Sequence, residues 1–312
     1  MEFQEVELTR QQYAKKLKIF IIIGVVVFIL PIIAVIINLI GVKSPLIHID
    51  YFVYLTIAFF AVALTAIIGV IATHKDAKNY KKLYKAYFVE QNLRKVFTDI
   101  EYNHEVGMPK SVLEATHVIN TGDYYYSNDY LKAKYKDVAF SQADVTIQEE
   151  YTDSDGNTHR TIIYKGRWMI FEFPKPFTFR LQVVEKWFTA SKKLHKDRDV
   201  KRSIERLQTE SINFDKKYKV YAEDGFEAYY ILDPAFLSHI EDLGNSHKGK
   251  LMLAFIDNKL HIALNDGNDA FEAPNPLKKL DKTAESAKVL NDIKTITDFV
   301  DFLKLDHKLF KK

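Results

Sequence analysis

The sequence contains no cysteine, and this absence excludes several kinds of chemistry at once. Disulfide bonds, thiolate nucleophiles and thiolate metal ligands are impossible in this chain. The chain also lacks a G-x-S-x-G motif, a Walker lysine loop and a glycine fingerprint for dinucleotides. Its net charge is only +3, from 44 basic and 41 acidic residues, which does not favour nucleic acid as a partner. We therefore expect no cofactor, no metal and no nucleic-acid partner, and the sequence identifies no catalytic residue.

Charge is missing from two long apolar runs near the start of the chain. No charged side chain occurs from Ile19 to Val42 or from Tyr51 to Thr73, and each run exceeds the roughly 20 residues that a helix needs to cross a bilayer. Lipid offers no partner to backbone N–H and C=O groups, so each run should be helical. The first run is too long for a signal peptide and no small-x-small cleavage site follows it. We expect residues 1–76 to form a retained transmembrane hairpin.

The basic residues predict how this hairpin is oriented. They crowd its two outer flanks, as Arg10, Lys15, Lys16 and Lys18 before the first run and Lys75, Lys78, Lys81, Lys82 and Lys85 after the second. The loop from Lys43 to Asp50 holds only one lysine. Because short loops follow the positive-inside rule, both termini should be cytoplasmic, in a two-span protein of the inner (plasma) membrane. The five lysines after the second run should contact the anionic membrane surface.

The composition of the two runs is typical of an anchor. Ala61, Thr65 and Gly69 stand four residues apart, and such small residues let helix backbones approach closely. We expect them to pack the second helix against the first, with dimerisation as the alternative. Pro31 is expected to kink the first helix. Neither run carries an ionisable group, which argues against a channel or transporter formed by this chain alone.

Beyond the hairpin the pattern predicts an α+β protein. Helical spacing runs from Ala77 to about Glu101, and Ser111 should cap a second, shorter helix. We expect a juxtamembrane helical segment at 77–125 and a cytoplasmic α+β domain at 126–312, with a mostly antiparallel sheet and a C-terminal helix. Further strands are predicted near Val145–Glu149, Arg160–Phe173, Phe177–Glu185, Ile212–Ala222, Phe226–Leu232, Lys250–Ile256 and Lys259–Leu264, and helices at Ala235–Leu243 and Thr283–Leu305.

Two acidic clusters have the composition of turns. The segment Asp153–Asn157 separates two predicted strands and is a strong hairpin signal. A calcium-binding EF-hand loop needs glycine at its sixth position and glutamate at its twelfth, whereas Gly156 comes too early and Tyr164 takes the last position. Turn chemistry also explains Asn265–Asp269. We therefore predict a hairpin turn at Asp153–Asn157, a turn at Asn265–Asp269 and no calcium site.

Two further segments allow more than one interpretation. The mixed charges from Lys192 to Arg206 favour a solvated segment, and contact with the anionic inner leaflet is the alternative. The run Tyr124–Tyr126 fits either a partner-binding patch or a strand with one ring in the core.

Several longer motifs resemble one known family. They are the hairpin followed by Tyr80–Tyr84, then Tyr164–Phe173, Phe214–Tyr221, Glu227–Pro234 and Phe255–Leu260. In these motifs the chain resembles a bacterial membrane family catalogued as domain of unknown function 3137. The resemblance implies an inner-membrane protein of bacteria with a cytoplasmic domain. None of the motifs is a catalytic signature, so the resemblance supplies neither an activity nor a site residue.

Together these patterns favour a membrane-anchored cytoplasmic module that binds or scaffolds another molecule at the bacterial inner leaflet. Its expected partners are the lipid bilayer and a protein. One alternative is an accessory subunit of a membrane transport or envelope complex. Another is an enzyme that acts on a membrane-adjacent substrate with a site built from dispersed polar residues. A deep pocket with converging acidic or histidine side chains would favour the enzyme, and an exposed apolar patch would favour binding.

Overall fold

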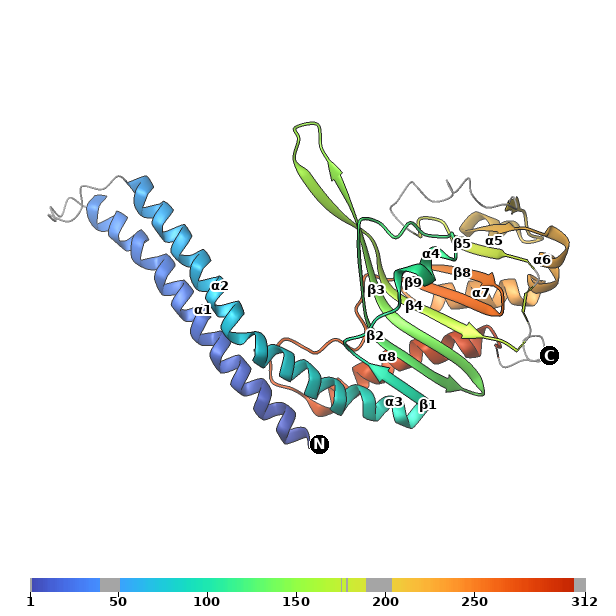
Figure 1. Cartoon of the computed structure of the whole chain (residues 1–312), viewed down its shortest axis with the longest axis horizontal. Coiled ribbons are helices and arrows are strands. Elements are labelled where there is room, and N and C mark those ends of the chain that lie inside the picture. Colours follow the sequence, from blue (N-terminus) through green and yellow to red (C-terminus); the bar gives the residue numbers. More distant parts are fainter. Residues whose placement is uncertain (1, 40–50, 175, 178, 189–203, 306–312) are drawn as a thin grey trace. The chain divides into compact units, whose positions relative to one another are not determined.

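The structure is a computed structural model of the chain, and it describes residues 2–39, 51–174, 176–177, 179–188 and 204–305 (Figure 1). The chain divides into two compact units. One comprises residues 1–88 and 272–285, and the other comprises residues 89–271 and 286–312. The loop predicted outside the membrane, Lys43 to Asp50, and most of the charged segment from Lys192 to Arg206 lie outside the described residues.

The first unit is built on two long helices that contain the apolar runs. Helix α1 spans Phe3–Leu39 and continues through Pro31, and helix α2 spans Tyr51–Tyr84. Both helices were predicted. They run antiparallel, because the residues in contact follow opposite orders along the two helices. Lys16 contacts Asp76, whereas the earlier Tyr13 contacts the later Tyr80. One turn of π-helix, η1 (Lys85–Glu90), continues α2.

The second unit is built on one antiparallel sheet. Within the described residues it has nine strands in the order β1-β2-β3-β4-β9-β8-β5-β7-β6. The strands are β1 (Thr98–Asn103), β2 (Tyr124–Tyr135), β3 (Val138–Thr152), β4 (Thr158–Glu172), β5 (Leu181–Glu185), β6 (Glu205–Leu207), β7 (Tyr218–Ala222), β8 (Lys250–Ile256) and β9 (Lys259–Asn265). Its helices are α3 (Gln91–Val96), α4 (Lys110–Glu114), α5 (Ile212–Lys217), α6 (Gly225–Ile231), α7 (Pro234–Ser246) and most of α8 (Lys282–Phe302). The predicted α+β class is confirmed.

The sheet separates two layers of side chains, because alternate residues of a strand point to opposite faces. Trp168 of β4 is fully buried and enters a core with Leu113 of α4. Its neighbour Arg167 points the other way and reaches Asp292 of α8, where its Nη2 lies 2.9 Å from Asp292 Oδ1. Helix α7 packs near α8, since the His247 ring lies 5.3 Å from that of Phe299. Helices α7 and α8 therefore cover the face opposite α4.

The predictions that depend on local turns and strong periodicity are confirmed. The turn at Asp153–Asn157 joins β3 to β4, and a two-residue turn at Asp257 joins β8 to β9. Helices α7 and α8 occupy the segments predicted for them. The run Tyr124–Tyr126 opens β2, and Tyr125 packs against the core, with its hydroxyl donating to Met108 O at 2.7 Å.

The helix predicted from Ala77 to Glu101 is wrong at its end. Helix α3 ends at Val96, and Thr98–Asn103 forms β1. Ile100 and Tyr102 alternate as the partly buried residues of this strand, which pairs antiparallel with β2. The Tyr102 hydroxyl also donates to Asp129 Oδ1 at 2.5 Å. Pairing with β2 thus outweighs the helical spacing in the sequence.

Two predicted strands are helical instead. Helix α5 replaces the first half of the strand predicted at Ile212–Ala222, and α6 replaces the strand predicted at Phe226–Leu232. Each helix has a side-chain cap, because Ser211 Oγ accepts from Phe214 N and Asp224 Oδ1 accepts from Phe226 N. Such caps satisfy backbone N–H groups that a helix start leaves free, and they favour helix despite the aromatic composition.

Two smaller predictions are also wrong. Ser111 does not cap α4, because Pro109 holds the N-cap position with an extended backbone and no side chain caps the helix. The strand predicted at Phe177–Glu185 is shorter than expected, because β5 begins only at Leu181. The α4 boundary follows from Pro109, because proline fixes its own backbone angle and favours the start of a helix. The N-cap of α4 therefore lies two residues before Ser111.

A buried histidine stabilises the core beside β4. Trp168 Nε1 donates to His261 Nδ1 at 3.2 Å, so Nδ1 is the hydrogen-bond acceptor of this imidazole and carries no proton. Burial, together with the positive charge of Lys259, lowers the pKa of His261 to about 4. An unfolded histidine has a pKa near 6.5. As the pH falls from 6.5 to 4, the unfolded chain therefore takes up a proton that the folded chain excludes, and stability decreases.

We expect His261→Asn to weaken this acid sensitivity, because the asparagine Oδ1 accepts from Trp168 Nε1 but does not titrate. In the wild type, His261 should lower the free energy of unfolding by about 2 kcal/mol between pH 7 and pH 5. The measurement is urea unfolding of the detergent-solubilised chain at both pH values, followed by tryptophan fluorescence. Equal pH dependence in the two proteins would contradict the prediction.

Candidate functional site

The helix pair presents an extended apolar surface. Two helical segments, Phe3–Ile33 and Thr56–Val96, are long and apolar enough to cross a membrane. Large apolar side chains point outward along both helices, and those of Phe59, Val70 and Ile71 are about 70% exposed. In water such a surface is unfavourable, at roughly 25 cal/mol for each Å² of apolar area. The outward side chains therefore fit a surrounding of lipid.

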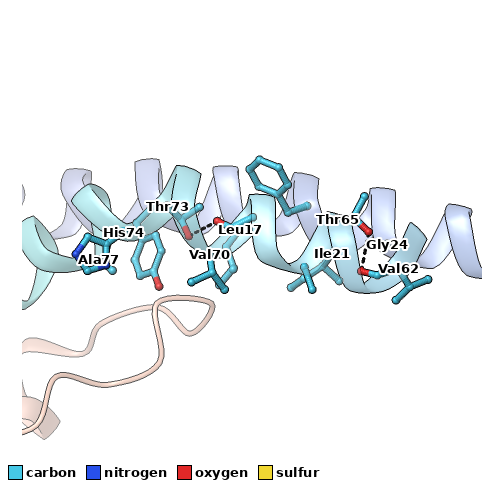
Figure 2. A pocket seen from close by; sticks show the side chains of 13 residues that line it. Leu17, Ile21, Gly24, Val62, Thr65, Val70, Thr73, His74 and Ala77 are labelled. Atoms are coloured by element: carbon cyan, nitrogen blue, oxygen red, sulfur yellow. Dashed lines mark hydrogen bonds between the residues drawn. The ribbon is translucent and has the colours of Figure 1, made fainter. Parts of the chain in front are cut away.

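The predicted packing residues lie along α2 beside α1. Gly69 is buried, and a Cβ atom at this position would lie 3.1 Å from Phe20 Cβ of α1. Ala61 and Thr65 are partly buried, and Thr65 Oγ1 donates to Ala61 O at 2.8 Å. Gly69 and Thr65 also line an apolar groove of about 420 Å³ between the helices (Figure 2). Glycine at position 69 thus permits the close approach of the two backbones.

The same two helices continue beyond the apolar runs as a polar stalk, which we define as residues 3–18 and 75–88. Lys16 Nζ pairs with Asp76 Oδ2 at 2.8 Å. The returning segment 272–285 binds along the stalk, where the Tyr80 hydroxyl donates to Pro274 O and Arg10 donates to Pro276 O. The sequence gives no local signal for this segment, because its contacts join residues that are far apart in the chain.

The five lysines predicted at the membrane surface lie on the α2 side of this stalk and on η1. Lys75, Lys78, Lys81 and Lys82 are exposed. Lys81 Nζ pairs with Glu272 Oε1 at 2.5 Å. Lys85 is buried, and its Nζ lies 4.0 Å from the other carboxylate oxygen of Glu272. Contact of the lysines with lipid stays a prediction.

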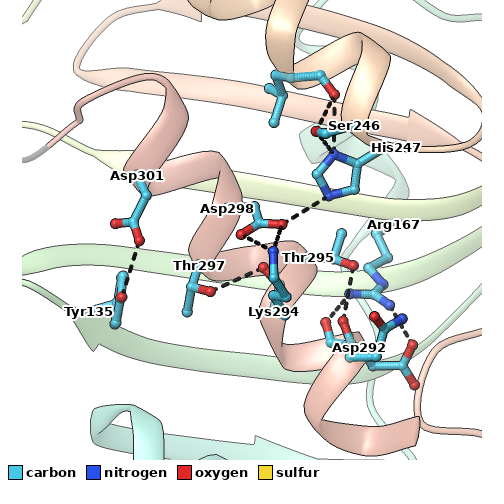
Figure 3. Close-up of polar contacts among 12 residues, drawn as sticks. Tyr135, Arg167, Ser246, His247, Asp292, Lys294, Thr295, Thr297, Asp298 and Asp301 are labelled. Atoms are coloured by element: carbon cyan, nitrogen blue, oxygen red, sulfur yellow. Dashed lines mark hydrogen bonds and ion pairs between the residues drawn. The ribbon is translucent and has the colours of Figure 1, made fainter.

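A serine, a histidine and an aspartate meet between α7 and α8 (Figure 3). Ser246 Oγ lies 2.8 Å from His247 Nδ1, and His247 Nε2 lies 3.7 Å from Asp298 Oδ2. The serine hydroxyl donates to Leu243 O at 2.9 Å, and His247 Nδ1 also faces that carbonyl at 3.1 Å. Both side chains therefore contact the Leu243 carbonyl, one of those that the end of α7 leaves without a partner inside the helix. This arrangement is a helix terminus and not an activated nucleophile.

Three aspartates from different elements converge in the sheet unit. Carboxylate oxygens of Asp129, Asp144 and Asp269 all lie within 4.8 Å of one another. Asp144 comes from β3 and Asp269 follows β9. Asp129 lies at a bulge of β2, where the register with β3 shifts between Asn128 and Leu131. A bulge can re-aim a side chain, and here it directs Asp129 toward the other two carboxylates.

The surroundings of these three carboxylates differ. The Asp129 oxygens accept from the Tyr102 hydroxyl at 2.5 Å and from Asn128 Nδ2 at 2.7 Å. Asp144 is 3% exposed, and neither of its carboxylate oxygens has a hydrogen-bond partner among the described residues. Burial raises the pKa of Asp144 well above its usual range, although the Arg167 guanidinium opposes this shift; Asp129 and Asp269 raise the pKa further.

Sequence reasoning missed this group. Asp269 was assigned to a turn, but the turn bonds are made by Asp266, whose carboxylate accepts from the backbone and side chain of Asn268. Asp144 lies in a strand whose side chains alternate between the two faces of the sheet. A charged residue at a buried position of such a strand is unusual, and this is the one feature of the sequence that could have indicated a site. Nothing in the sequence connects either residue with Asp129, because the sheet register alone brings β2 and β3 together.

We expect Gly69→Leu to disrupt the packing of α1 on α2. The leucine side chain would overlap Phe20, and such overpacking costs about 1–3 kcal/mol. Because the chain has no cysteine, a disulfide between Lys16→Cys and Asp76→Cys measures the distance between the helices in membranes. Its yield should fall several-fold with Gly69→Leu. Gly24→Leu is the matched control, since a Cβ atom at Gly24 meets nothing within 4 Å. Equal yields in both variants would contradict the prediction.

Two comparisons with known proteins gave a match. A crystal structure of the mycobacterial trehalose monomycolate transport factor A, TtfA, is similar over 72% of this chain and 95% of its own, with 10% sequence identity and a TM-score of 0.36. A likeness at that level carries no argument about function. No curated protein matches the chain. Residues 162–305 match the profile described as "Protein of unknown function (DUF3137)". The match includes four of the motifs that carry the predicted resemblance, and it supports that resemblance over residues 162–305.

Proposed function

We propose that this chain is a membrane-anchored binding module whose sheet unit faces the cytoplasm at the inner leaflet of a bacterial membrane. The observation that carries the proposal is the exposed apolar surface along α1 and α2. Its hydrogen-bonded helices satisfy the backbone groups that lipid leaves without partners. The hydroxyls of Thr65 and Thr73 are also satisfied within α2, because each donates to the carbonyl four residues earlier.

The distribution of charge supports the orientation in this proposal. Because α1 and α2 are antiparallel, the basic residues before the first run and after the second lie at the same end of the helix pair. The positive-inside rule assigns that end to the cytoplasm. An anchored binding module gains local concentration near its partner without any chemistry of its own.

Exposed aromatic side chains in the sheet unit support protein binding over catalysis. Phe226 and Tyr230 of α6 are 70% and 66% exposed, and their rings lie 5.4 Å apart. The Tyr229 hydroxyl donates to Gln208 O at 2.9 Å, which ties α6 to the segment that precedes α5. Ile212, at the start of α5, is 75% exposed. Apolar and aromatic residues exposed together are typical of interaction surfaces.

The chain should remain in the membrane fraction after an alkaline carbonate wash. In intact spheroplasts a reporter fused after Lys312 should be active in the cytoplasm, and external protease should leave the sheet unit uncut. Recovery of the chain in the soluble fraction would overturn the anchor. Digestion of the sheet unit by external protease would overturn the orientation alone.

The charge distribution yields a sharper test. Replacement of Lys75, Lys78 and Lys82 by glutamate should reduce the fraction of molecules with a cytoplasmic C-terminus, because only charges within about 15–20 residues of a span control its orientation. The matched control replaces Lys216, Lys219 and Lys248, which lie in the sheet unit, and should leave topology unchanged. The measurement is the ratio of cytoplasmic to external reporter activity. The same ratio in both triple variants would show that other signals set the orientation.

A further inference from the structure

Three acidic groups converge where β2, β3 and the loop after β9 meet. Arg167, whose charge acts on Asp144, is bound to Asp292, with its Nη2 2.9 Å from Oδ1 and its Nη1 donating to the backbone carbonyl. The other carboxylate oxygen of Asp292 accepts from Phe271 N at 3.1 Å. This ion pair is therefore complete and electrically neutral. Carboxylate oxygens of Asp129, Asp144 and Asp269 all lie within 4.8 Å of one another.

The second observation is the state of Asp144. Its side chain is 97% buried and aimed at the other two carboxylates, yet neither oxygen accepts a hydrogen bond among the described residues. Gln142 lies two residues earlier on the same face of β3 and is fully buried, and within the described part of the chain its side-chain amide also has no hydrogen-bond partner. Buried polar groups in proteins are nearly always paired, and an unpaired buried charge is especially unfavourable.

We propose that Asp129, Asp144 and Asp269 form a binding site for a divalent cation, with calcium as the preferred ion. The donors are oxygen atoms alone, which suit the hard cations calcium, magnesium and manganese. Magnesium usually binds one or two carboxylates and keeps several waters, whereas calcium accepts more carboxylate ligands. Three carboxylates therefore favour calcium.

The neighbouring residues support such a role. The Tyr102 hydroxyl and Asn128 amide each donate to one oxygen of Asp129. Such outer hydrogen bonds orient metal ligands. Asp269 is only partly buried and lies in a loop, so an ion can reach the site from solvent.

The test uses the full chain purified in detergent, stripped with a chelator and then titrated separately with calcium, magnesium and manganese chlorides. The wild type should bind one calcium ion in a saturable manner, and its unfolding midpoint should rise with calcium concentration. Calcium should bind more tightly than magnesium. No saturable binding of any of the three ions would overturn the proposal, and would favour a proton shared among the carboxylates.

Variants make the assignment specific. Asp144→Asn keeps the shape of the side chain but supplies no anionic ligand, so the chain should still fold and should lose the calcium-dependent shift completely. Asp269→Asn, in the partly exposed loop, should do the same without any risk to the core. Tyr102→Phe should weaken calcium binding by about 10–100-fold. The matched control is Asp155→Asn in the exposed β3–β4 turn, which should bind as the wild type does. Wild-type binding in both Asp144→Asn and Asp269→Asn would overturn the site.

Discussion

The structure depends on one constraint, which is that buried or lipid-facing polar groups need partners. In the helix pair this constraint selects α-helix for the apolar runs, because every backbone bond is then satisfied within the helix. It also explains why the hydroxyls of Thr65 and Thr73 fold back onto carbonyls of α2. The apolar side chains that remain outward, such as Phe59 and Ile71, are each 71% exposed.

The sheet unit satisfies the same constraint with different means. The antiparallel ladders pair the backbone, and alternate side chains divide into two layers. Polar residues that enter these layers find specific partners: Arg167 with Asp292, and Trp168 with His261. Each pair joins elements that are distant in the sequence, so each pair also fixes the packing of one element on another. The neutral state of His261 follows directly from its place in this interior.

The sequence predicts those parts of the fold that are determined by nearby residues. The apolar runs, the turn at Asp153–Asn157 and the helix at α8 have strong local patterns, and all are present. Short elements were assigned wrongly where a local and a distant interaction compete. Pairing with β2 made Thr98–Asn103 a strand, and the Ser211 and Asp224 caps made α5 and α6 helical. The stalk contacts of the segment 272–285 had no local signal at all.

The candidate cation site was beyond sequence reasoning for the same physical reason. A linear calcium motif places its ligands at fixed spacing in one loop, and the two acidic turns fail that test. Here the ligands come from a bulge, a strand and a loop, and only the sheet register brings them together. Neither carboxylate oxygen of Asp144 has a hydrogen-bond partner among the described residues, and the Gln142 amide shares this state. The polar groups of Tyr102, Ser246 and Arg167 in the same unit each have a partner. The buried Asp144 carboxylate, which has no hydrogen-bond partner among the described residues, is therefore the strongest structural argument for a ligand at the three aspartates.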